Sequence, residues 1–272
     1  MKELGYLVQQ VRQKRPLVHH ITNYVTVNDC ANITLAIGAS PVMADEPKEM
    51  PDITGIADGL VLNIGTLNQQ KLASMLSAGK VANEKGIPVV LDPVGVGASE
   101  FRRVAIHQLL DEIKINVLRG NISEIRSIAG LASVSKGVDA SNEDIRRDEG
   151  REEVAAYLAR ELECVVIISG EVDVISDGQK TMCVKNGHPM LGNITGTGCM
   201  CSSLVGSLCG ANPDNILEAS VVAMVSMGIA GEIAYKRAGG LGGGSFRVAL
   251  HDEISKMNKE MIERMGRIHE GQ

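Results

Sequence analysis

Aromatic residues are scarce in this 272-residue sequence, which has no tryptophan, two phenylalanines and four tyrosines. Proteins that hold single-stranded nucleic acid stack its bases on aromatic side chains, so the composition disfavours that class of function. With few rings to fill space, the core has to be built from aliphatic residues and methionine, and 44% of the residues are hydrophobic. No linker rich in proline or serine interrupts the sequence, and we expect a single globular domain over residues 1–272.

An excess of basic residues is also missing. The sequence has 27 Lys and Arg against 33 Asp and Glu, a formal net charge of −6. A mildly acidic protein lacks the positive field that steers association with DNA, RNA or anionic lipid. We therefore expect no nucleic-acid partner and no membrane partner, although a local cluster of cations can still hold a small anion.

Cysteine pairs at metal-binding or redox spacing are absent. None of the six cysteines forms a C-x-x-C pair, and several lie in apolar runs, where a free cysteine packs as a small hydrophobe. The first residues, MKELGYLVQQVRQKRP, carry charges throughout and have no apolar signal core. The most apolar long window, residues 217–234, contains two glutamates, which favours a buried helix over a membrane span. We expect a reducing, cytoplasmic setting.

Short apolar runs alternate with longer segments of helical periodicity. Strands are expected at Leu17–His20, Leu60–Ile64, Pro88–Leu91, Ile115–Leu118 and Cys164–Ile168. Helices between them are expected at Leu67–Lys85, Arg102–Lys114 and Glu152–Leu162. Strands that are apolar on both faces and alternate with helices build a mostly parallel sheet covered on both sides. The expected fold class is therefore α/β, a sandwich of a central sheet between helices.

The C-terminal part of the sequence has a different pattern. Two β-branched runs joined by Asp177-Gly178, at Val172–Ser176 and Lys180–Val184, predict a hairpin. Three helices are expected after it, at Gly198–Cys209, Asn215–Lys236 and Phe246–Arg267. The last third of the chain should therefore be helical.

A polar residue and a glycine follow each of four predicted strands. The four loops are Asn63-Ile64-Gly65-Thr66, Asp92-Pro93-Val94-Gly95-Val96-Gly97, Arg119-Gly120-Asn121 and Ser169-Gly170-Glu171. In open parallel sheets, ligands bind at the carboxyl ends of the strands. The sequence therefore predicts that these loops meet at one edge of the sheet and carry the site.

The strongest single motif is the small-residue turn Asn193–Cys199, NITGTGC, which leads into a predicted helix. Glycines at 196 and 198 let backbone amides approach a ligand closely, and a helix N-terminus favours negative charge. The turn is a candidate anion hole for a phosphoryl group, although its spacing alone suits a plain tight turn equally well. Walker-type, dinucleotide-binding, G-x-S-x-G and H-E-x-x-H motifs are absent from the sequence.

The segment Gly196-Thr197-Gly198-Cys199 resembles the G-[AT]-G-D anion-hole signature of the ribokinase-like superfamily, with cysteine in place of the aspartate base. Together with HHITN at 19–23, ASPVM at 39–43 and DPVG at 92–95, it resembles the hydroxyethylthiazole kinase family over roughly residues 17–210. The resemblance implies a ribokinase-like three-layer sandwich. It also implies a homotrimer with active sites at subunit interfaces.

The activity implied by this resemblance is the ATP- and Mg²⁺-dependent phosphorylation of the primary alcohol of 4-methyl-5-(2-hydroxyethyl)thiazole, in thiamine salvage. Asn121-Ile122-Ser123-Glu124 is similar to the N-x-x-E motif that organises Mg²⁺ and phosphate in the superfamily. The resemblance assigns catalysis to Gly196, Thr197, Gly198 and Cys199, nucleotide contacts to Arg119, Asn121 and Ser169, thiazole contacts to Asn23, Met43 and Gly196, and Mg²⁺ to Asp92 and Glu124. Whether Cys199 acts as the base or only orients the hydroxyl stays open.

Each of these residues also has a plainer interpretation when taken alone. Asp92 suits a turn, Glu124 the first turn of a helix and Met43 a core position. His19 and His20 are neighbours on a strand and point to opposite faces, so a shared metal is disfavoured. Two rival functions remain: a kinase of another vitamin-precursor alcohol such as hydroxymethylpyrimidine, and a non-catalytic ligand sensor on the same fold.

Overall fold

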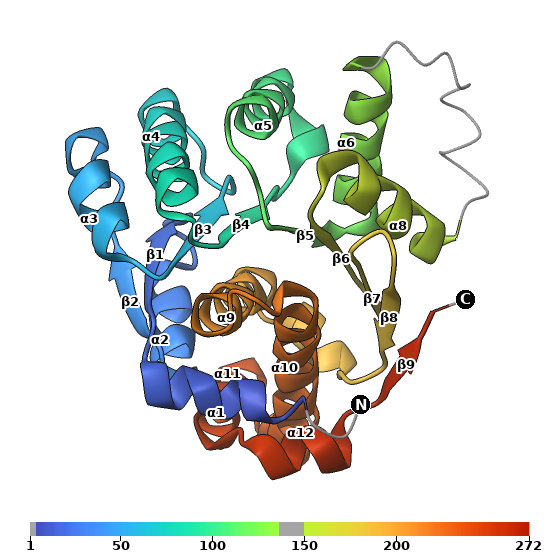
Figure 1. Cartoon of the computed structure of the whole chain (residues 1–272). Coiled ribbons are helices and arrows are strands. Elements are labelled where there is room, and N and C mark those ends of the chain that lie inside the picture. The colour runs from blue at the N-terminus through green and yellow to red at the C-terminus, as the bar shows by residue number, and fades with distance from the viewer. Residues whose placement is uncertain (1–3, 136–149, 272) are drawn as a thin grey trace.

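Figure 1 shows the computed structural model of the chain, which describes residues 4–135 and 150–271. Within these residues one mixed sheet of nine strands runs through the molecule, in the order β2-β1-β3-β4-β5-β6-β7-β8-β9. Helices cover both of its faces (Figure 1). The predicted three-layer α/β sandwich with a mostly parallel central sheet is therefore confirmed.

The parallel part of the sheet contains the predicted strands and one more. Its members are β1 (Leu17–Ile21), β2 (Ser40–Met43), β3 (Gly59–Asn63), β4 (Val89–Asp92), β5 (Val117–Asn121) and β6 (Val165–Ser169). Strand β2 was not predicted, because its proline does not fit a central strand. Proline is tolerated at a sheet edge, and β2 is the edge strand.

Three antiparallel strands extend the sheet beyond β6. They are β7 (Asp173–Ser176), β8 (Thr181–Val184) and β9 (Ile268–Glu270). The first two form the predicted hairpin, and Gly178 in its turn has φ +87°. Strand β9 brings the C-terminal segment back against the hairpin (Figure 1).

The helices form two layers, one on each face of the sheet (Figure 1). One layer contains α3 (Met50–Ile56), α4 (Gln69–Lys85), α5 (Glu100–Glu112), α6 (Ile122–Ser135) and α8 (Arg151–Leu162). The other contains α1 (Tyr6–Lys14), α2 (Val27–Ile37), α9 (Thr197–Ala211), α10 (Ile216–Ala238), α11 (Gly243–Lys256) and α12 (Lys259–Met265). Short 3₁₀ turns are η1 (Pro47–Glu49), η2 (Val96–Ala98), η3 (Pro189–Asn193) and η4 (Gly239–Leu241).

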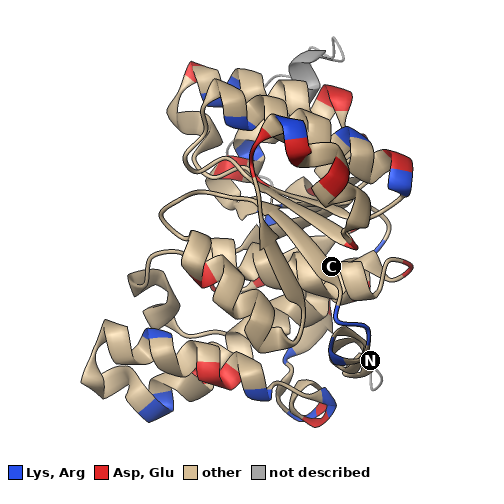
Figure 2. Cartoon of the chain, turned by 90° about the vertical axis from the view of Figure 1, so that its left-hand side faces the viewer, with Lys and Arg blue, Asp and Glu red and all other residues tan. Residues whose placement is uncertain are grey.

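Alternate residues of the central strands fill two separate cores. Val61 and Val90 pack against the layer of α9 and α10, whereas Leu62 and Leu91 pack against the layer of α4 and α5. All four side chains are buried, which explains why these strands read as continuous apolar runs. Basic and acidic residues lie intermixed along the outer helices in the view of Figure 2.

Helix α10 is the long apolar segment that the sequence predicted to be buried. With the turn that follows, it spans Ile216–Leu241, long and apolar enough to cross a membrane by length and composition, and 78% of its most apolar window is buried. It packs against α9 and α11 in the core of the sandwich. The expectation of a buried helix is confirmed.

The prediction of one helix over Phe246–Arg267 is wrong. The backbone leaves the helical region at Met257, with φ −54° and ψ 132°, and a second helix, α12, begins after Asn258. The Asn258 side chain caps it by accepting a hydrogen bond from the Met261 amide at 3.0 Å. Asparagine at an N-cap was the signal for this break.

Candidate active site

The predicted strand-end loops lie together at one edge of the sheet. Asn63 at the end of β3 is paired with Asp92 at the end of β4, and Asn121 at the end of β5 is paired with Ser169 at the end of β6. The expectation that the four loops meet at one edge of the sheet is confirmed. Three of these residues were assigned roles by resemblance, and Asn63 was not.

The NITGTGC turn leads into α9 beside this edge. Gly196 is the N-cap of the helix and has φ +90°, a left-handed conformation that side chains rarely adopt. A Cβ atom on Gly198 would lie 2.9 Å from Nη1 of Arg119, so the turn and this arginine are in close contact. The first amides of α9 therefore begin beside a fixed positive charge, which is an arrangement suited to an anion.

A chain of hydrogen bonds crosses the site from α2 to α9. Thr26 Oγ1 donates to Asn23 Oδ1 at 3.1 Å, and Asn23 Nδ2 donates to Asn63 Oδ1 at 3.0 Å. Asn63 Nδ2 donates to Asp92 Oδ2 at 2.8 Å, and Ser202 Oγ donates to the same oxygen at 2.8 Å. The predicted thiazole residue Asn23 is thus joined to the predicted magnesium residue Asp92.

Cys199 lies in the middle of this chain. Its Sγ accepts from Asn23 Nδ2 at 3.2 Å and from Asn63 Nδ2 at 3.3 Å. Burial raises the pKa of the Cys199 thiol, the charge of Asp92 raises it further, and these amide hydrogen bonds oppose the shift. A raised pKa means that the neutral thiol predominates at pH 7.

Asp92 is buried, and its two oxygens have different surroundings. Oδ2 accepts the bonds from Asn63 and Ser202, whereas Oδ1 is buried without a hydrogen-bond partner among the described residues. Burial raises the pKa of this carboxyl, and the nearby Arg119 opposes the shift most strongly. An orphaned carboxylate oxygen at a strand end fits a bound cation or its water, because such a partner would satisfy it.

Glu124 caps the turn between β5 and α6. Its Oε2 accepts from the Asn121 amide at 2.8 Å, while Asn121 Oδ1 accepts from the Glu124 amide at 3.0 Å. Its Oε1 accepts from the Gly95 amide at 2.9 Å, which ties the loop after β4 to this turn. With both oxygens already bonded to backbone, Glu124 suits a contact with Mg²⁺ through water better than a direct one.

A cleft of about 600 Å³ opens at the ends of β5 and β6. Four predicted residues line it, namely Arg119, Ser169, Thr197 and Gly198. Nε of Arg119 is buried and has no hydrogen-bond partner among the described residues, so the guanidinium keeps a donor for an anion.

The far wall of the cleft is formed by residues that the sequence did not single out, Asn186, Gly187, His188, Pro189, Leu191, Met224 and Met227. The His188 and Tyr235 rings stack at 3.6 Å between centroids, which orders this wall. Asp173 also lines the cleft, and burial raises its pKa to about 6, against the hydrogen bond from the Gly170 amide and the charge of Arg119. These residues come from β7, the loop after β8, η3 and α10, which are far apart in the sequence.

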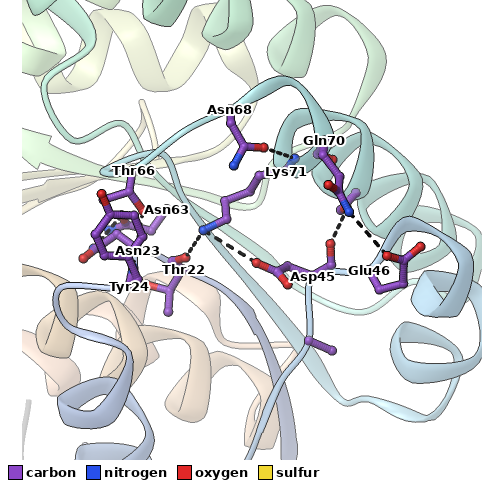
Figure 3. Close-up of polar contacts among 12 residues, drawn as sticks. Thr22, Asn23, Tyr24, Asp45, Glu46, Asn63, Thr66, Asn68, Gln70 and Lys71 are labelled. Carbon is purple, nitrogen blue, oxygen red and sulfur yellow. Dashed lines mark hydrogen bonds and ion pairs between the residues drawn. The ribbon is translucent and has the colours of Figure 1, made fainter.

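The two predicted thiazole residues lie at the ends of neighbouring strands: Asn23 follows β1, and Met43 is the last residue of β2. Figure 3 shows how Lys71 of α4 reaches between the segments after these two strands. Its buried Nζ donates to the Thr22 carbonyl at 2.8 Å and lies 3.7 Å from the Asp45 carboxylate. The first turn of α4 therefore connects the two strand ends beneath the predicted thiazole site.

Replacing Lys71 by methionine should lower the free energy of unfolding by about 1.5–3 kcal/mol, because it removes a charged hydrogen bond and leaves the Thr22 carbonyl unpaired. Thermal and urea denaturation measure the change. Lys80→Met on the same helix is the control, since the Lys80 ion pair with Glu112 is exposed and should contribute at most about 1 kcal/mol. Equal losses in the two variants would contradict a structural connection through Lys71.

The two histidines of β1 point to opposite faces of the sheet, as predicted. His19 contacts Thr54 of α3 through Nδ1 at 3.0 Å, and His20 contacts Thr34 of α2 through Nε2 at 3.3 Å. Burial lowers the pKa of both, that of His20 to about 3, so both rings are neutral at pH 7. Their contacts are structural: His19 Nε2 also bonds the Ala44 carbonyl, next to Met43.

Comparison with known proteins gives consistent matches. Residues 8–260 match the model of the Hydroxyethylthiazole kinase family. The hydroxyethylthiazole kinase of Clostridium beijerinckii is 56% identical over 270 residues, which cover 98% of this chain and 97% of that protein.

Solved structures agree with these sequence matches. The hydroxyethylthiazole kinase protein from Pyrococcus horikoshii has a TM-score of 0.89 at 39% identity, over 100% of both chains. The pyridoxal kinase from Staphylococcus aureus, solved with AMP-PCP and pyridoxal, has a TM-score of 0.56 at 17% identity, over 80% of this chain and 88% of that one. At that identity the second likeness shows the fold alone.

Proposed function

The chain belongs to the hydroxyethylthiazole kinase family, and we propose that it transfers the γ-phosphoryl group of ATP to the primary alcohol of 4-methyl-5-(2-hydroxyethyl)thiazole. The observation that carries this proposal is the hydrogen-bonded line from Asn23 through Asn63 to Asp92, with Cys199 at the start of α9 accepting from both amides. This line supports an alcohol site directly beside a phosphoryl site. The step belongs to the salvage of the thiazole half of thiamine.

Phosphoryl transfer needs positioning and charge neutralisation more than covalent chemistry. The amides at the start of α9, residues 196–199, are assigned to the γ-phosphoryl group, because Thr197 and Gly198 line the cleft and the N-terminus of the helix is the favourable end of its dipole for an anion. Arg119 adds a fixed positive charge in the same cleft, and Ser169 and Asn121 belong to the nucleotide side.

Asp92 and Glu124 are the residues proposed to hold Mg²⁺. An ion held there would neutralise charge on the phosphate groups of the nucleotide. Within the described ranges no group of three or more His, Cys, Asp or Glu side chains could hold a metal. This suits Mg²⁺, which is commonly held by one or two carboxylates together with phosphates and water. Asp92 has the free oxygen, and Glu124 fixes the adjoining loop at Gly95.

The alcohol is proposed to bind between Asn23, Met43 and the Gly196 turn, with its hydroxyl near Cys199. Asn23 offers an amide that can hydrogen-bond the heterocycle, and Met43 offers a pliable apolar wall. Cys199 receives hydrogen bonds from Asn23 and Asn63, so its sulfur is held in place by the two side-chain amides.

ADP release tests the activity directly. The purified protein, with ATP and Mg²⁺, is given the thiazole alcohol, hydroxymethylpyrimidine or no acceptor. We expect ADP and thiazole phosphate to form together in equal amounts with the thiazole alcohol, and only background ADP without an acceptor. Faster release with the pyrimidine alcohol would favour the rival kinase, and release independent of any acceptor would contradict an alcohol kinase.

We also propose that the chain forms one domain over residues 1–272 that assembles as a homotrimer in the cytoplasm. Tyr24 and Val25, directly after Asn23, are 76% and 59% exposed, and apolar side chains beside a site suit an interface that completes it. The cytoplasmic setting is supported by six cysteines that are all free. Analytical ultracentrifugation tests the assembly, and a monomer at micromolar concentration would contradict it.

Replacing Cys199 by serine should leave activity within about tenfold of the parent, because a hydroxyl can still hydrogen-bond the alcohol. Cys199→Asp should be at least as active, since a carboxylate is ordinarily ionised at pH 7. Both expectations follow from the raised pKa of the Cys199 thiol in the parent, which keeps the thiol protonated and makes it a weak base. In the loose transition state the alcohol proton leaves late, so a weak base suffices.

The pH dependence of kcat separates the two roles of Cys199. If the residue only orients the hydroxyl, the rate should be nearly flat between about pH 7 and 9. A rate limited by thiolate would climb about tenfold per pH unit over that range, because the raised pKa puts the thiol's ionisation above it. A loss of about 100-fold or more in both variants, with substrate binding unchanged, would establish essential thiolate catalysis instead.

A further inference from the structure

Asn63 lies where the two halves of the site meet. It is the last residue of β3, 1% exposed, between the segment after β1 and the end of β4. We propose that Asn63 is a positioning residue for phosphoryl transfer, whose single amide group holds Cys199 and Asp92 in a fixed relation to one another. This inference rests on the proposed kinase function, and assigns to Asn63 a role that it exerts through Cys199 and Asp92.

All of the hydrogen-bonding capacity of this amide is used. Nδ2 donates to Asp92 Oδ2 at 2.8 Å and to Cys199 Sγ at 3.3 Å. Oδ1 accepts from Asn23 Nδ2 at 3.0 Å and from the Gly65 amide at 2.9 Å. An asparagine side chain has two donors and two acceptor lone pairs, so no position is left over.

The four partners also fix which way the amide points. Turned by 180°, it would place its oxygen against the Asp92 carboxylate and its NH₂ group against the amides of Asn23 and Gly65. Each contact would then join two acceptors or two donors. The observed orientation is therefore the one that this network permits, and it directs both N–H bonds toward Asp92 and Cys199.

As a consequence, the two carboxylate oxygens of Asp92 have separate roles. Because Asn63 and Ser202 occupy Oδ2, the carboxylate cannot rotate freely, and Oδ1, which has no hydrogen-bond partner among the described residues, is left for a ligand. The same NH₂ group holds Cys199 Sγ on its other side. The distance between the residue near the alcohol and the carboxylate near the nucleotide is thus set by one rigid planar group, and small errors in such distances cost large factors in rate.

Asparagine is required here because the group must donate twice without bringing a charge. Aspartate has nearly the same shape and would still accept from Asn23 and Gly65. It cannot donate, and it would put a negative charge against Asp92 and beside Cys199. Asn63→Asp therefore keeps the packing and removes the function, whereas Asn63→Ser keeps an uncharged donor on a shorter side chain.

The test compares Asn63→Asp and Asn63→Ser with the parent and with Asn116→Asp. Asn116 precedes β5 at the opposite end of the sheet, and its Oδ1 accepts from the Val89 amide at 2.9 Å, a role that a carboxylate can keep. We expect Asn63→Asp to lower kcat by about 100-fold with the KM values for both substrates within about threefold. Asn63→Ser should lose less, and Asn116→Asp should match the parent.

A second readout does not depend on turnover. Iodoacetamide alkylates thiolates, and Cys199 is partly exposed whereas the five other cysteines are buried, so it should react first. Without the donated hydrogen bond and with an added negative charge nearby, alkylation of Cys199 at pH 8 should slow by about tenfold in Asn63→Asp. Mass spectrometry locates the adduct, and Cys199→Ala shows the background.

The outcomes separate the possible roles. A parental alkylation rate in both Asn63 variants, whatever their kcat, would overturn the proposal, because Asn63 would then not hold Cys199. If circular dichroism shows that Asn63→Asp does not fold, Asn63→Ser is tested by the same two measurements, kcat and the alkylation rate of Cys199. Parental values of both would overturn the proposal, and a loss in both would support it. If the parent itself releases no ADP with the thiazole alcohol, the proposed function fails, while the alkylation comparison still tests the contact.

Discussion

Replacing Gly196 by valine should lower kcat/KM by about 100- to 1000-fold, the loss expected when a preorganised amide donor no longer meets the charge of the transition state. Gly196 has φ +90°, and a Cβ atom there would lie 2.7 Å from Cγ2 of Thr26. Because Thr26 is fixed by Asn23, the turn rather than the threonine has to move. The first amides of α9 then shift away from the position assigned to the phosphoryl group.

Gly242→Val is the matched control for this substitution. Gly242 is the N-cap of α11, has φ +105° and would place its Cβ atom in open space. Like Gly196, it has a positive φ that side chains rarely adopt, but a Cβ atom there meets no collision. Steady-state kinetics and thermal denaturation should show a similar fall in stability for both variants, and a loss of transfer for Gly196→Val alone. Near-parental activity of folded Gly196→Val would remove the anion hole from the mechanism.

The sandwich could be predicted because its central strands are buried on both faces. Runs such as Leu60–Ile64 and Cys164–Ile168 have no polar alternation, and that pattern is typical of parallel strands between helices. The observed strands begin and end within one residue of these two predictions. Strand β2 escaped prediction since its proline favours a non-strand interpretation, and only its place at the sheet edge makes the proline acceptable.

For the site too, some features could be predicted from the local sequence, whereas others depend on contacts between residues that are distant in the sequence. The loop containing Asn63 and Gly65 was predicted to lie at the site, because a polar residue and a glycine follow an apolar strand. That the Asn63 amide joins Asp92 to Cys199 could not be predicted, since those partners are 29 and 136 positions away in the sequence. Ser202 likewise looked like an ordinary small residue of a buried helix, and only the packing of α9 on β4 gives it a carboxylate to bond.

Replacing Asp92 by asparagine should have the other largest effect, a fall in kcat of about 100-fold or more together with a weaker response to Mg²⁺. Asn63 and Ser202 both donate to Oδ2, so an amide at position 92 must turn its oxygen toward them. Its NH₂ group then takes the place of the unpartnered Oδ1. Two N–H bonds would point where a cation is expected, and the negative charge would be gone.

The measurement is a Mg²⁺ titration of the transfer rate at saturating ATP and thiazole alcohol, with the KM for the alcohol determined at each end. Asp173→Asn is the matched control, because Asp173 is also a buried carboxyl, lines the cleft, and accepts a hydrogen bond from the Gly170 amide at 2.9 Å. We expect the control to keep the parental Mg²⁺ dependence and Asp92→Asn to need more Mg²⁺, with the alcohol KM nearly unchanged in both. If the Mg²⁺ titration curve of Asp92→Asn overlays that of the parent, Asp92 is a structural residue of the strand end and does not hold the ion.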